Sequence, residues 1–407
     1  MARNIIYDKG GSASTINGLL KEDYITDQIA EAVNKSTVFL SKLKSVTSTH
    51  GRRFVFPVQL GVSQGFGARS ENETLPDSGF GEYEQALGNV KYLYGSMYIT
   101  GQSIDATAGS KAAFKDVLKQ ALFDVREGAK LDLQRQVFGD GTGKIGLING
   151  AASSATQTVD SPYGLTYAGT LTGSENLRLF RRNMELYFDS GTDAQEKVIA
   201  INPSAGTIEL ENSVNLDDNA VIYRGDSTSL YSKDKEITGI SGIVAATGTY
   251  LNIVRAGKPE WQGNLVDAAG AITEEKMRIA MDQGLINGNA ECDLILTDLV
   301  TRRRYEKLLQ AQKRFVKPMD LEGGFSALEF DGKPLVADKD APAERMWFLH
   351  TPDINWMVMK EWGFMDRDGA VLSRVANKDA YEANLVSYRE MICRRPANQT
   401  VLYGITS

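Results

Sequence analysis

A glycine-rich run at residues 141–146 has the spacing of a nucleotide-binding pattern. Gly141-Thr-Gly143-Lys-Ile-Gly146 fits GxGxxG, in which glycines let backbone amides at a helix N-terminus approach a pyrophosphate. Here the run follows a predicted helix instead of a strand, and Ile145 after Lys144 leaves no hydroxyl for magnesium. These glycines are therefore predicted to end a helix, and a cytoplasmic α/β nucleotide-binding enzyme stays a remote alternative.

Histidine and cysteine offer little for catalysis or metal binding. His50 and His350 are the only histidines, and Cys292 and Cys393 are the only cysteines. Neither histidine lies in a nucleophile motif, and the four residues lack the paired spacing of zinc ligands. His350 is predicted to lie at a strand end, and each cysteine is predicted to be a buried free thiol. We expect no catalytic residue, no metal site and no cofactor.

Two groups of charged residues of opposite sign could form assembly contacts. The acidic group lies in a polar stretch between two predicted strands and comprises Glu71, Glu73, Asp77, Glu82 and Glu84. The basic group recurs at helical spacing along a long predicted helix and comprises Lys115, Lys119, Arg126 and Lys130. We hypothesise that the acidic loop packs over the basic stripe of a neighbouring subunit. The alternative is solvation together with pairs within the helix, such as Glu127 with Lys130.

A further basic run, Arg302 to Arg304, is the place where nucleic-acid contact could be argued. It lies on a predicted helix on which Arg302 and Glu306 form an i,i+4 pair. A solvated helix flank is therefore favoured.

Composition limits the class of protein. The 407 residues include 45 Lys and Arg and 52 Asp and Glu, which gives a formal net charge of −7. A surface that grips the nucleic-acid backbone throughout would be basic. Because single cores rarely exceed about 250–300 residues, we expect several structural units. Two cysteines suit a reducing compartment, and we find neither a secretory signal nor 18 consecutive apolar residues, so we expect a soluble cytoplasmic product.

The first half of the chain shows helix and hairpin patterns. Residues 1–23 read as a polar arm that needs a partner surface to be ordered, followed by a helix over 24–43. Strand-like runs over 54–62 and 83–104 predict a hairpin with a long projecting loop. Residues 110–138 predict a helix about 43 Å long.

The second half of the chain combines a β-rich stretch with alternating predicted helices and strands. Short β-type runs between residues 151 and 225 predict a small all-β module inserted into the chain. Beyond residue 272, predicted helices over 273–285 and 298–312 alternate with strands at 292–297, 335–337 and 346–349, which implies an α/β layer. Further strands are predicted at 382–389 and 400–405.

Three sequence segments resemble the major capsid proteins of tailed bacteriophages, which have the Hong Kong 97 fold. They are Val137-Phe-Gly-Asp-Gly-Thr-Gly143, Phe325-Ser-Ala-Leu-Glu-Phe-Asp-Gly-Lys-Pro-Leu-Val-Ala-Asp338 and Lys378-Asp-Ala-Tyr-Glu382. The resemblance implies an α+β fold with an inserted all-β domain. It implies the order N-terminal arm and helix (1–53), E-loop (54–91), P-domain with spine helix (92–150), β-rich insertion domain and linker (151–259), A-domain (260–360) and P-domain return strands (361–407).

By the same resemblance, the chain is expected to be a capsid subunit without catalysis. It would assemble with itself, in the host cytoplasm, into pentamers and hexamers of the icosahedral shell of a virion. Packaged double-stranded DNA would make weak, non-specific contacts with a subunit of charge −7. A portal protein is an expected partner and a decoration protein a candidate one. An encapsulin-like nanocompartment shell is the alternative.

Two departures from the family pattern matter. Some members crosslink subunits through an E-loop lysine, but residues 54–90 contain none. We therefore predict a shell held by noncovalent contacts. Some members begin with a coiled-coil scaffolding segment, but no heptad run precedes the arm here, so we expect a separate scaffolding protein.

Overall fold

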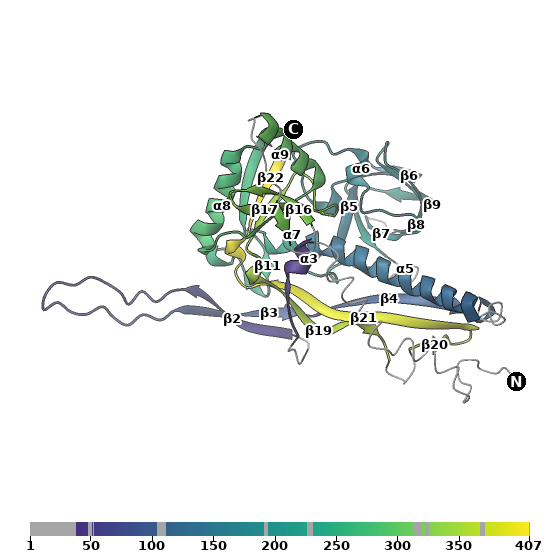
Figure 1. Cartoon of the computed structure of the whole chain (residues 1–407), viewed down its shortest axis with the longest axis horizontal. Coiled ribbons are helices and arrows are strands. Elements are labelled where there is room, and N and C mark those ends of the chain that lie inside the picture. Colours follow the sequence, from purple (N-terminus) through teal and green to yellow (C-terminus); the bar gives the residue numbers. More distant parts are fainter. Residues whose placement is uncertain are drawn as a thin grey trace. The chain divides into compact units, whose positions relative to one another are not determined.

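Figure 1 shows the computed structural model of the protein, in which the chain forms two compact units. It describes residues 38–47, 51, 53–103, 111–190, 194–225, 231–311, 319–321, 325–366 and 371–406. Unit 1 comprises Met1–His50, Val90–Gln134 and Met357–Arg389, and unit 2 comprises Gly51–Asn89, Arg135–Trp356 and Glu390–Ser407. The predicted arm and most of the first predicted helix lie outside the described residues. Only α3 (Val38–Lys42) can be compared with that helix.

Unit 1 is built on a five-stranded sheet. Its main order is β1 (Lys44–Val46), β19 (Ile354–Phe364), β21 (Ala380–Cys393) and β20 (Ser373–Arg374), and β4 (Lys91–Thr100) also pairs with β21. The long helix α5 (Lys111–Phe138) confirms the helix predicted over 110–138. It packs on β4, because a Cβ added to Gly95 would lie 3.3 Å from Val125 Cγ1.

Strand β4 presents two different faces. Leu93, Met97 and Ile99 alternate toward the buried side, whereas Tyr94 and Tyr98 alternate toward solvent. The period of two is that of a strand buried on one face only. The helix-covered face is the apolar one.

The strand predicted over 83–104 is in fact two strands. β3 (Glu82–Asn89) pairs with β2 (Arg53–Gly61), and β4 pairs with β21. The chain changes sheets at Val90, whose side chain is buried. The buried positions change phase at this point, from even-numbered residues up to Val90 to odd-numbered residues from Leu93 onward.

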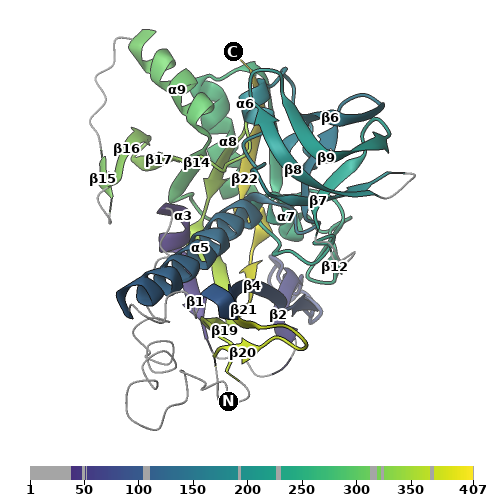
Figure 2. The ribbon, with the colours of Figure 1, turned by 90° about the vertical axis from the view of Figure 1, so that its right-hand side faces the viewer.

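Unit 2 contains a mixed seven-stranded sheet (Figure 2). Its order is β13 (Asn264–Ala271), β22 (Thr400–Thr406), β18 (Met346–Leu349), β14 (Leu294–Thr297), β17 (Lys333–Ala337), β16 (Phe325–Phe330) and β15 (Met319–Leu321). The pairs β13–β22 and β14–β17 are parallel, and the others are antiparallel. The predicted layer of alternating helices and strands is thus confirmed.

Helices α8 (Glu274–Gly288) and α9 (Leu299–Ala311) cover one face of this sheet. Met277 of α8 and Tyr305 of α9 belong to one buried cluster with Ile295 and Phe348 of the sheet. Because the central strands are buried on both faces, β14 and β18 read as continuous apolar runs. On the opposite face Trp347 contacts Phe138, with ring centroids 6.0 Å apart.

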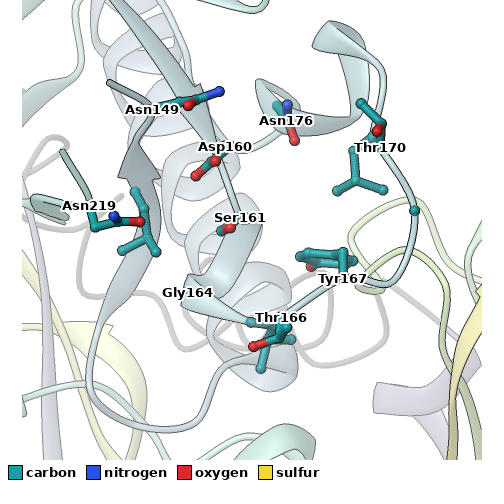
Figure 3. Close-up of a pocket in the computed structure, with 13 residues that line it drawn as sticks. Asn149, Asp160, Ser161, Gly164, Thr166, Tyr167, Thr170, Asn176 and Asn219 are labelled. Atoms are coloured by element: carbon teal, nitrogen blue, oxygen red, sulfur yellow. The ribbon is translucent and has the colours of Figure 1, made fainter. Parts of the chain in front are cut away.

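The inserted β module is a closed six-stranded barrel. Its order is β10 (Val221–Arg224), β5 (Lys144–Ile148), β6 (Ala152–Asp160), β9 (Thr207–Leu216), β8 (Ala194–Asn202) and β7 (Glu185–Asp189). Completely buried side chains fill it: Ile148, Val159, Phe188, Val198, Ile208 and Ile222. The barrel therefore begins at β5, before the predicted boundary at residue 151. A pocket of about 450 Å³ lies beside β5 and β6, next to the short helix α6 (Gly173–Asn176) (Figure 3).

The chain enters and leaves the barrel at the same place. Gly141 and Gly143 have φ values of 90° and 84°, which glycine adopts without strain, and they turn the chain from α5 into β5. On the returning segment, the Asp234 amide donates to the Thr142 carbonyl at 2.9 Å. A Cβ on Gly143 would lie 2.6 Å from the Ser232 carbonyl oxygen.

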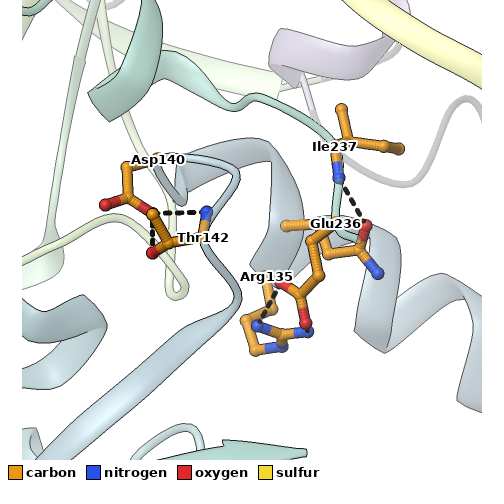
Figure 4. A network of polar contacts seen from close by, with 6 residues as sticks. Arg135, Asp140, Thr142, Glu236 and Ile237 are labelled. Atoms are coloured by element: carbon orange, nitrogen blue, oxygen red, sulfur yellow. Dashed lines mark hydrogen bonds and ion pairs between the residues drawn. The ribbon is translucent and has the colours of Figure 1, made fainter. Parts of the chain in front are cut away.

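A buried ion pair fixes this junction (Figure 4). Two guanidinium nitrogens of Arg135 donate to the two carboxylate oxygens of Glu236 at 2.8 and 2.5 Å. The neighbouring Ile237 amide donates to the Gln136 side chain at 3.2 Å. The segment that leaves the barrel is therefore held against the last turns of α5.

Candidate assembly surfaces

The hairpin of β2 and β3 carries a long loop over residues 62–81. Alternate residues of the paired strands, including Phe54, Val58 and Ala86, are buried. In the loop, by contrast, four apolar side chains are between 69% and 91% exposed: Val62, Phe66, Leu75 and Phe80. A cluster of large exposed apolar groups is typical of a surface that contacts another protein.

The loop backbone is nevertheless ordered by its own contacts. Ser63 Oγ donates to the Gly79 carbonyl at 2.8 Å, which joins the two sides of the loop. At the tip, Arg69 Nε donates to the Thr74 carbonyl at 2.9 Å. The Glu73 carboxylate accepts the Ser70 amide at 2.7 Å. The loop thus presents its apolar side chains on a self-supported backbone.

The five acidic residues of the hairpin differ in their surroundings. Glu71, Asp77 and Glu82 are exposed, and Glu73 stabilises the turn at the tip. Glu84 lies at the base, where its carboxylate accepts from Lys258 Nζ of the same chain. Four carboxylates are thus directed toward solvent or the loop itself, and the fifth is already paired.

The base of the hairpin rests on the segment around β11 (Thr249–Tyr250) and β12 (Ile253–Val254). The Leu87 amide donates to the Leu251 carbonyl at 2.8 Å. Arg255 is 1% exposed, and its guanidinium donates to the Gly242 and Ile243 carbonyls at 2.9 Å each. No local sequence pattern marks Arg255 or Lys258, because the partner of Lys258 lies far along the chain and those of Arg255 are backbone carbonyls.

The basic stripe is described only in part. The side chains of Lys115 and Lys119 lie outside the described residues. Arg126 and Lys130 both approach the Glu127 carboxylate, at 3.8 and 3.7 Å. The Arg126 guanidinium also lies 5.2 Å from the Phe123 ring centroid. The pairs within the helix are present, and docking of the acidic loop on this stripe stays a prediction.

The glycine-rich run does not form a nucleotide site. Residues 141–143 of the run lie between α5 and β5, and residues 144–146 belong to β5, so no helix N-terminus follows the run. The Thr142 amide, central to the run, instead donates to Asp140 Oδ1 at 2.9 Å (Figure 4). The predicted helix stop is confirmed.

The remaining chemistry-bearing residues have structural roles. His350 directly follows β18, as predicted, and its Nδ1 lies 2.8 Å from the Glu291 carbonyl oxygen. Cys292 and Cys393 are buried free thiols, also as predicted. Burial raises the pKa of Cys292 to about 11 and that of Cys393 further, so both thiols stay protonated at neutral pH. His50 lies outside the described residues.

The described residues hold neither a metal-binding cluster nor a helix suited to span a membrane. They contain no group of three or more His, Cys, Asp or Glu side chains placed to hold a metal ion. Of the helices in this part of the chain, none combines the length and the apolar character needed to cross a membrane.

Solved structures resemble this chain over most of its length. A chain of the capsid asymmetric unit of cyanophage A-1(L) has a TM-score of 0.53 and 13% identity, over 94% of this chain and 93% of that chain. The capsid of a native GTA particle gives 0.49 and 12%, over 90% of each chain. The SrpI encapsulin of Synechococcus elongatus PCC 7942 gives 0.44 and 10%, over 91% and 89%. No protein-family model and no curated protein matches the sequence.

The cyanophage likeness concerns the fold, since the identity is low. It agrees with the α+β arrangement of a hairpin loop, a long helix and two sheets. The chain has the Hong Kong 97-type fold of capsid proteins.

Proposed function

We propose that this chain is the major capsid protein of a tailed phage. In this proposal, copies assemble into pentamers and hexamers of an icosahedral shell that encloses double-stranded DNA, and the chain catalyses no reaction. The observation that carries the proposal is the loop of residues 62–81, whose apolar side chains are exposed in the single chain. On a Hong Kong 97-type fold, such a loop is suited to cover a neighbouring copy.

Energetics support association through this loop. Burial of a phenylalanine side chain stabilises by about 1.5–3 kcal/mol, so Phe66 and Phe80 alone offer a substantial driving force. Part of it offsets the entropy lost on association. A closed symmetric shell repeats each contact many times, so modest pairwise energies suffice.

The partners follow from the same proposal. Because residues 54–90 contain no lysine, subunits would be joined by burial and ion pairs and not by an E-loop isopeptide bond. A separate scaffolding protein and a portal protein would act during assembly, and a decoration protein is a candidate further partner. DNA would contact the shell weakly, since the subunit has a net charge of −7.

Electron microscopy of the purified full-length chain tests the proposal. We expect closed icosahedral particles, and nuclease-protected double-stranded DNA in particles that are made together with the other phage proteins. Particles that enclose a cargo enzyme and no DNA would favour the encapsulin-like alternative. A monodisperse monomer at high concentration, with the loop of residues 62–81 already held rigid, would overturn shell formation altogether.

A further inference from the structure

The barrel contains a pocket lined by both polar and apolar groups. Its volume of about 450 Å³ lies in the range of small-molecule sites, about 300–1,000 Å³. The lining offers amides, one carboxylate, hydroxyls and one aromatic ring: Asn149, Asn176, Asn219, Asp160, Ser161, Thr166, Thr170 and Tyr167. Asn149 directly follows β5 and Asn219 lies just before β10, whereas the other groups come from β6, the 161–171 loop and α6; together they surround one space (Figure 3).

Two acceptor atoms of this wall have no donor. Asp160 Oδ1 and Asn176 Oδ1 are buried, and no hydrogen-bond donor among the described residues reaches either of them. Figure 3 shows the Asn176 oxygen directed into the space between Asp160 and Thr170. An unsatisfied buried acceptor costs about 1–3 kcal/mol. Neither oxygen has appreciable accessible surface, so each side chain must turn toward the pocket before a ligand hydroxyl can donate to it.

The loop that walls the pocket is fixed from behind. Glu344, which is 4% exposed, accepts the Ala168 amide at 2.7 Å and the Gly169 amide at 3.0 Å. Arg345 donates to the Thr166 carbonyl at 2.9 Å. A wall ordered before binding lowers the entropic cost of holding a ligand.

The aromatic ring is also held in place. The Tyr167 hydroxyl donates to the Pro162 carbonyl at 2.9 Å, and the Arg345 guanidinium lies 5.9 Å from the ring centroid. Burial raises the pKa of Tyr167 to about 12, so the ring stays a neutral phenol at neutral pH. It provides a fixed apolar surface within the pocket, which suits the C–H groups of a polyhydroxylated ring.

The lining disfavours other ligand classes. No Lys, Arg or His is among the described residues that line the pocket, so a phosphate or carboxylate ligand would lack a counter-charge. One carboxylate is too few for a calcium or magnesium site. Three leucines, Leu147, Leu165 and Leu171, also line the pocket, but residues with polar side chains outnumber them, and a lipid chain would leave those polar groups without hydrogen bonds.

We propose that this pocket binds a neutral sugar residue, either free or at the end of a glycan chain. Asn176 and Asp160 would accept hydrogen bonds from its hydroxyls, and the Tyr167 ring would pack against its C–H face. The site belongs to the barrel, so the proposal does not depend on whether the chain forms a shell.

Saturation-transfer NMR with the full-length protein tests this site. The probes are methyl glycosides of glucose, galactose, mannose and N-acetylglucosamine, followed by an array of neutral oligosaccharides. We expect at least one probe to bind, and Asn176→Ala to weaken its binding by about tenfold or more. Thr170→Trp should abolish binding by filling the pocket while leaving Asn176 and Asp160 in place. Asn215→Ala, an exposed asparagine of β9 outside the pocket, is the matched control.

Each result of the binding experiment either supports or overturns the proposed sugar site. Binding of a methyl glycoside supports a site for one sugar unit, and binding of oligosaccharides alone supports a site for a glycan end. Absence of binding across both panels overturns the proposal. It is equally overturned if Asn176→Ala and Thr170→Trp, with unchanged melting temperatures, bind as well as the unaltered protein, or if inorganic phosphate displaces the sugar.

Discussion

Individual buried charges in this protein are neutralised by partners that lie far along the chain. The Arg135 and Glu236 side chains are 7% and 6% exposed and form a two-bond pair. Arg389 is completely buried and donates to Glu361 at 2.8 Å. Since an unpaired charge is very costly in such surroundings, each pair fixes the relative positions of two segments.

Replacing Arg135 by methionine tests the first pair. Glu236 would remain buried without its partner, so Arg135→Met should lower the free energy of unfolding by about 3–5 kcal/mol. Adding Glu236→Leu should restore much of this loss. Denaturant titration of the unassembled subunit measures both. Arg302→Met, which breaks the half-exposed pair with Glu306, is the control and should cost at most about 0.5 kcal/mol. An equally small effect at Arg135 would contradict a structural role for the pair.

Asp338 makes stability depend on pH. It is 6% exposed, and burial is the main cause that raises its pKa to about 6 from the usual 3.8. Between these values the native state binds more protons than the unfolded state, so this residue lowers stability as pH rises from about 4 to 6. Asp338→Asn should remove that decline and stabilise the protein by roughly 2–3 kcal/mol at pH 7, since its amide oxygen can still accept the Asp340 amide. Unfolding measured from pH 4 to 8 checks this, with exposed Asp282→Asn as the control; parallel curves for both variants would count against it.

At the scale of elements, the proposed assembly would use the part of the hairpin that contributes least to folding. Its strands are anchored by the Leu87–Leu251 hydrogen bond and the Glu84–Lys258 pair, whereas the apolar side chains of its loop contribute little to the single chain. Substitutions in the loop should therefore change association and leave the stability of the subunit unchanged.

The double variant Phe66→Ser with Phe80→Ser tests this separation. Both rings are about 90% exposed, so the melting temperature of the unassembled subunit should change by less than about 2 °C. Loss of burial at every copy should raise the concentration needed for assembly by at least about tenfold. Light scattering measures the second quantity and calorimetry the first. Ile199→Ser, on the barrel surface, is the control; unimpaired assembly of the double variant would exclude the loop as an apolar contact.

The charge hypothesis makes a separate prediction for the same loop. If the acidic loop packs over the basic stripe of a neighbour, Glu71→Lys with Glu73→Lys should slow assembly, and most strongly at low salt, where charges are least screened. Glu209→Lys with Glu211→Lys changes the same number of exposed charges on the barrel and is the matched control. If both double variants assemble at the same rate, at 20 mM and at 300 mM salt, the docking hypothesis is wrong. Arg126 and Lys130 would then pair only with Glu127.

At the scale of the whole molecule, the sequence predicts elements better than their partners. The helix predicted over 110–138 is α5, and the run 346–349 is exactly β18, because both carry strong local apolar patterns. The change of sheet at Val90 and the membership of β5 in the barrel depend on strand pairing across the chain, which local patterns do not encode. Local patterns also do not encode the contacts of Lys258 and Arg255, or the pocket, whose residues come from separate parts of the sequence.

We predict that the barrel can be removed, because the segments that enter and leave it meet. Thr142 and Asp234 are joined by a backbone hydrogen bond, and the Arg135–Glu236 pair lies outside the barrel strands. A two-residue Gly-Ser link in place of residues 144–231 should therefore close the gap without strain in the sheet of unit 2. The variant should remain folded and assemble, and it should lose any sugar binding.

A second deletion, with boundaries that cut through a barrel strand, serves as the comparison for the first. Removal of residues 156–225 would leave β5 and half of β6 without their barrel partners β7 to β10, and so expose unpaired strand edges. We expect that variant to aggregate, whereas the 144–231 deletion yields soluble subunits with native-like circular dichroism and particles under the electron microscope. If the 144–231 deletion fails to fold although Arg135 and Glu236 are intact, the barrel is part of the core fold. Its contacts to Asp340 and Glu344 would then be essential to the sheet.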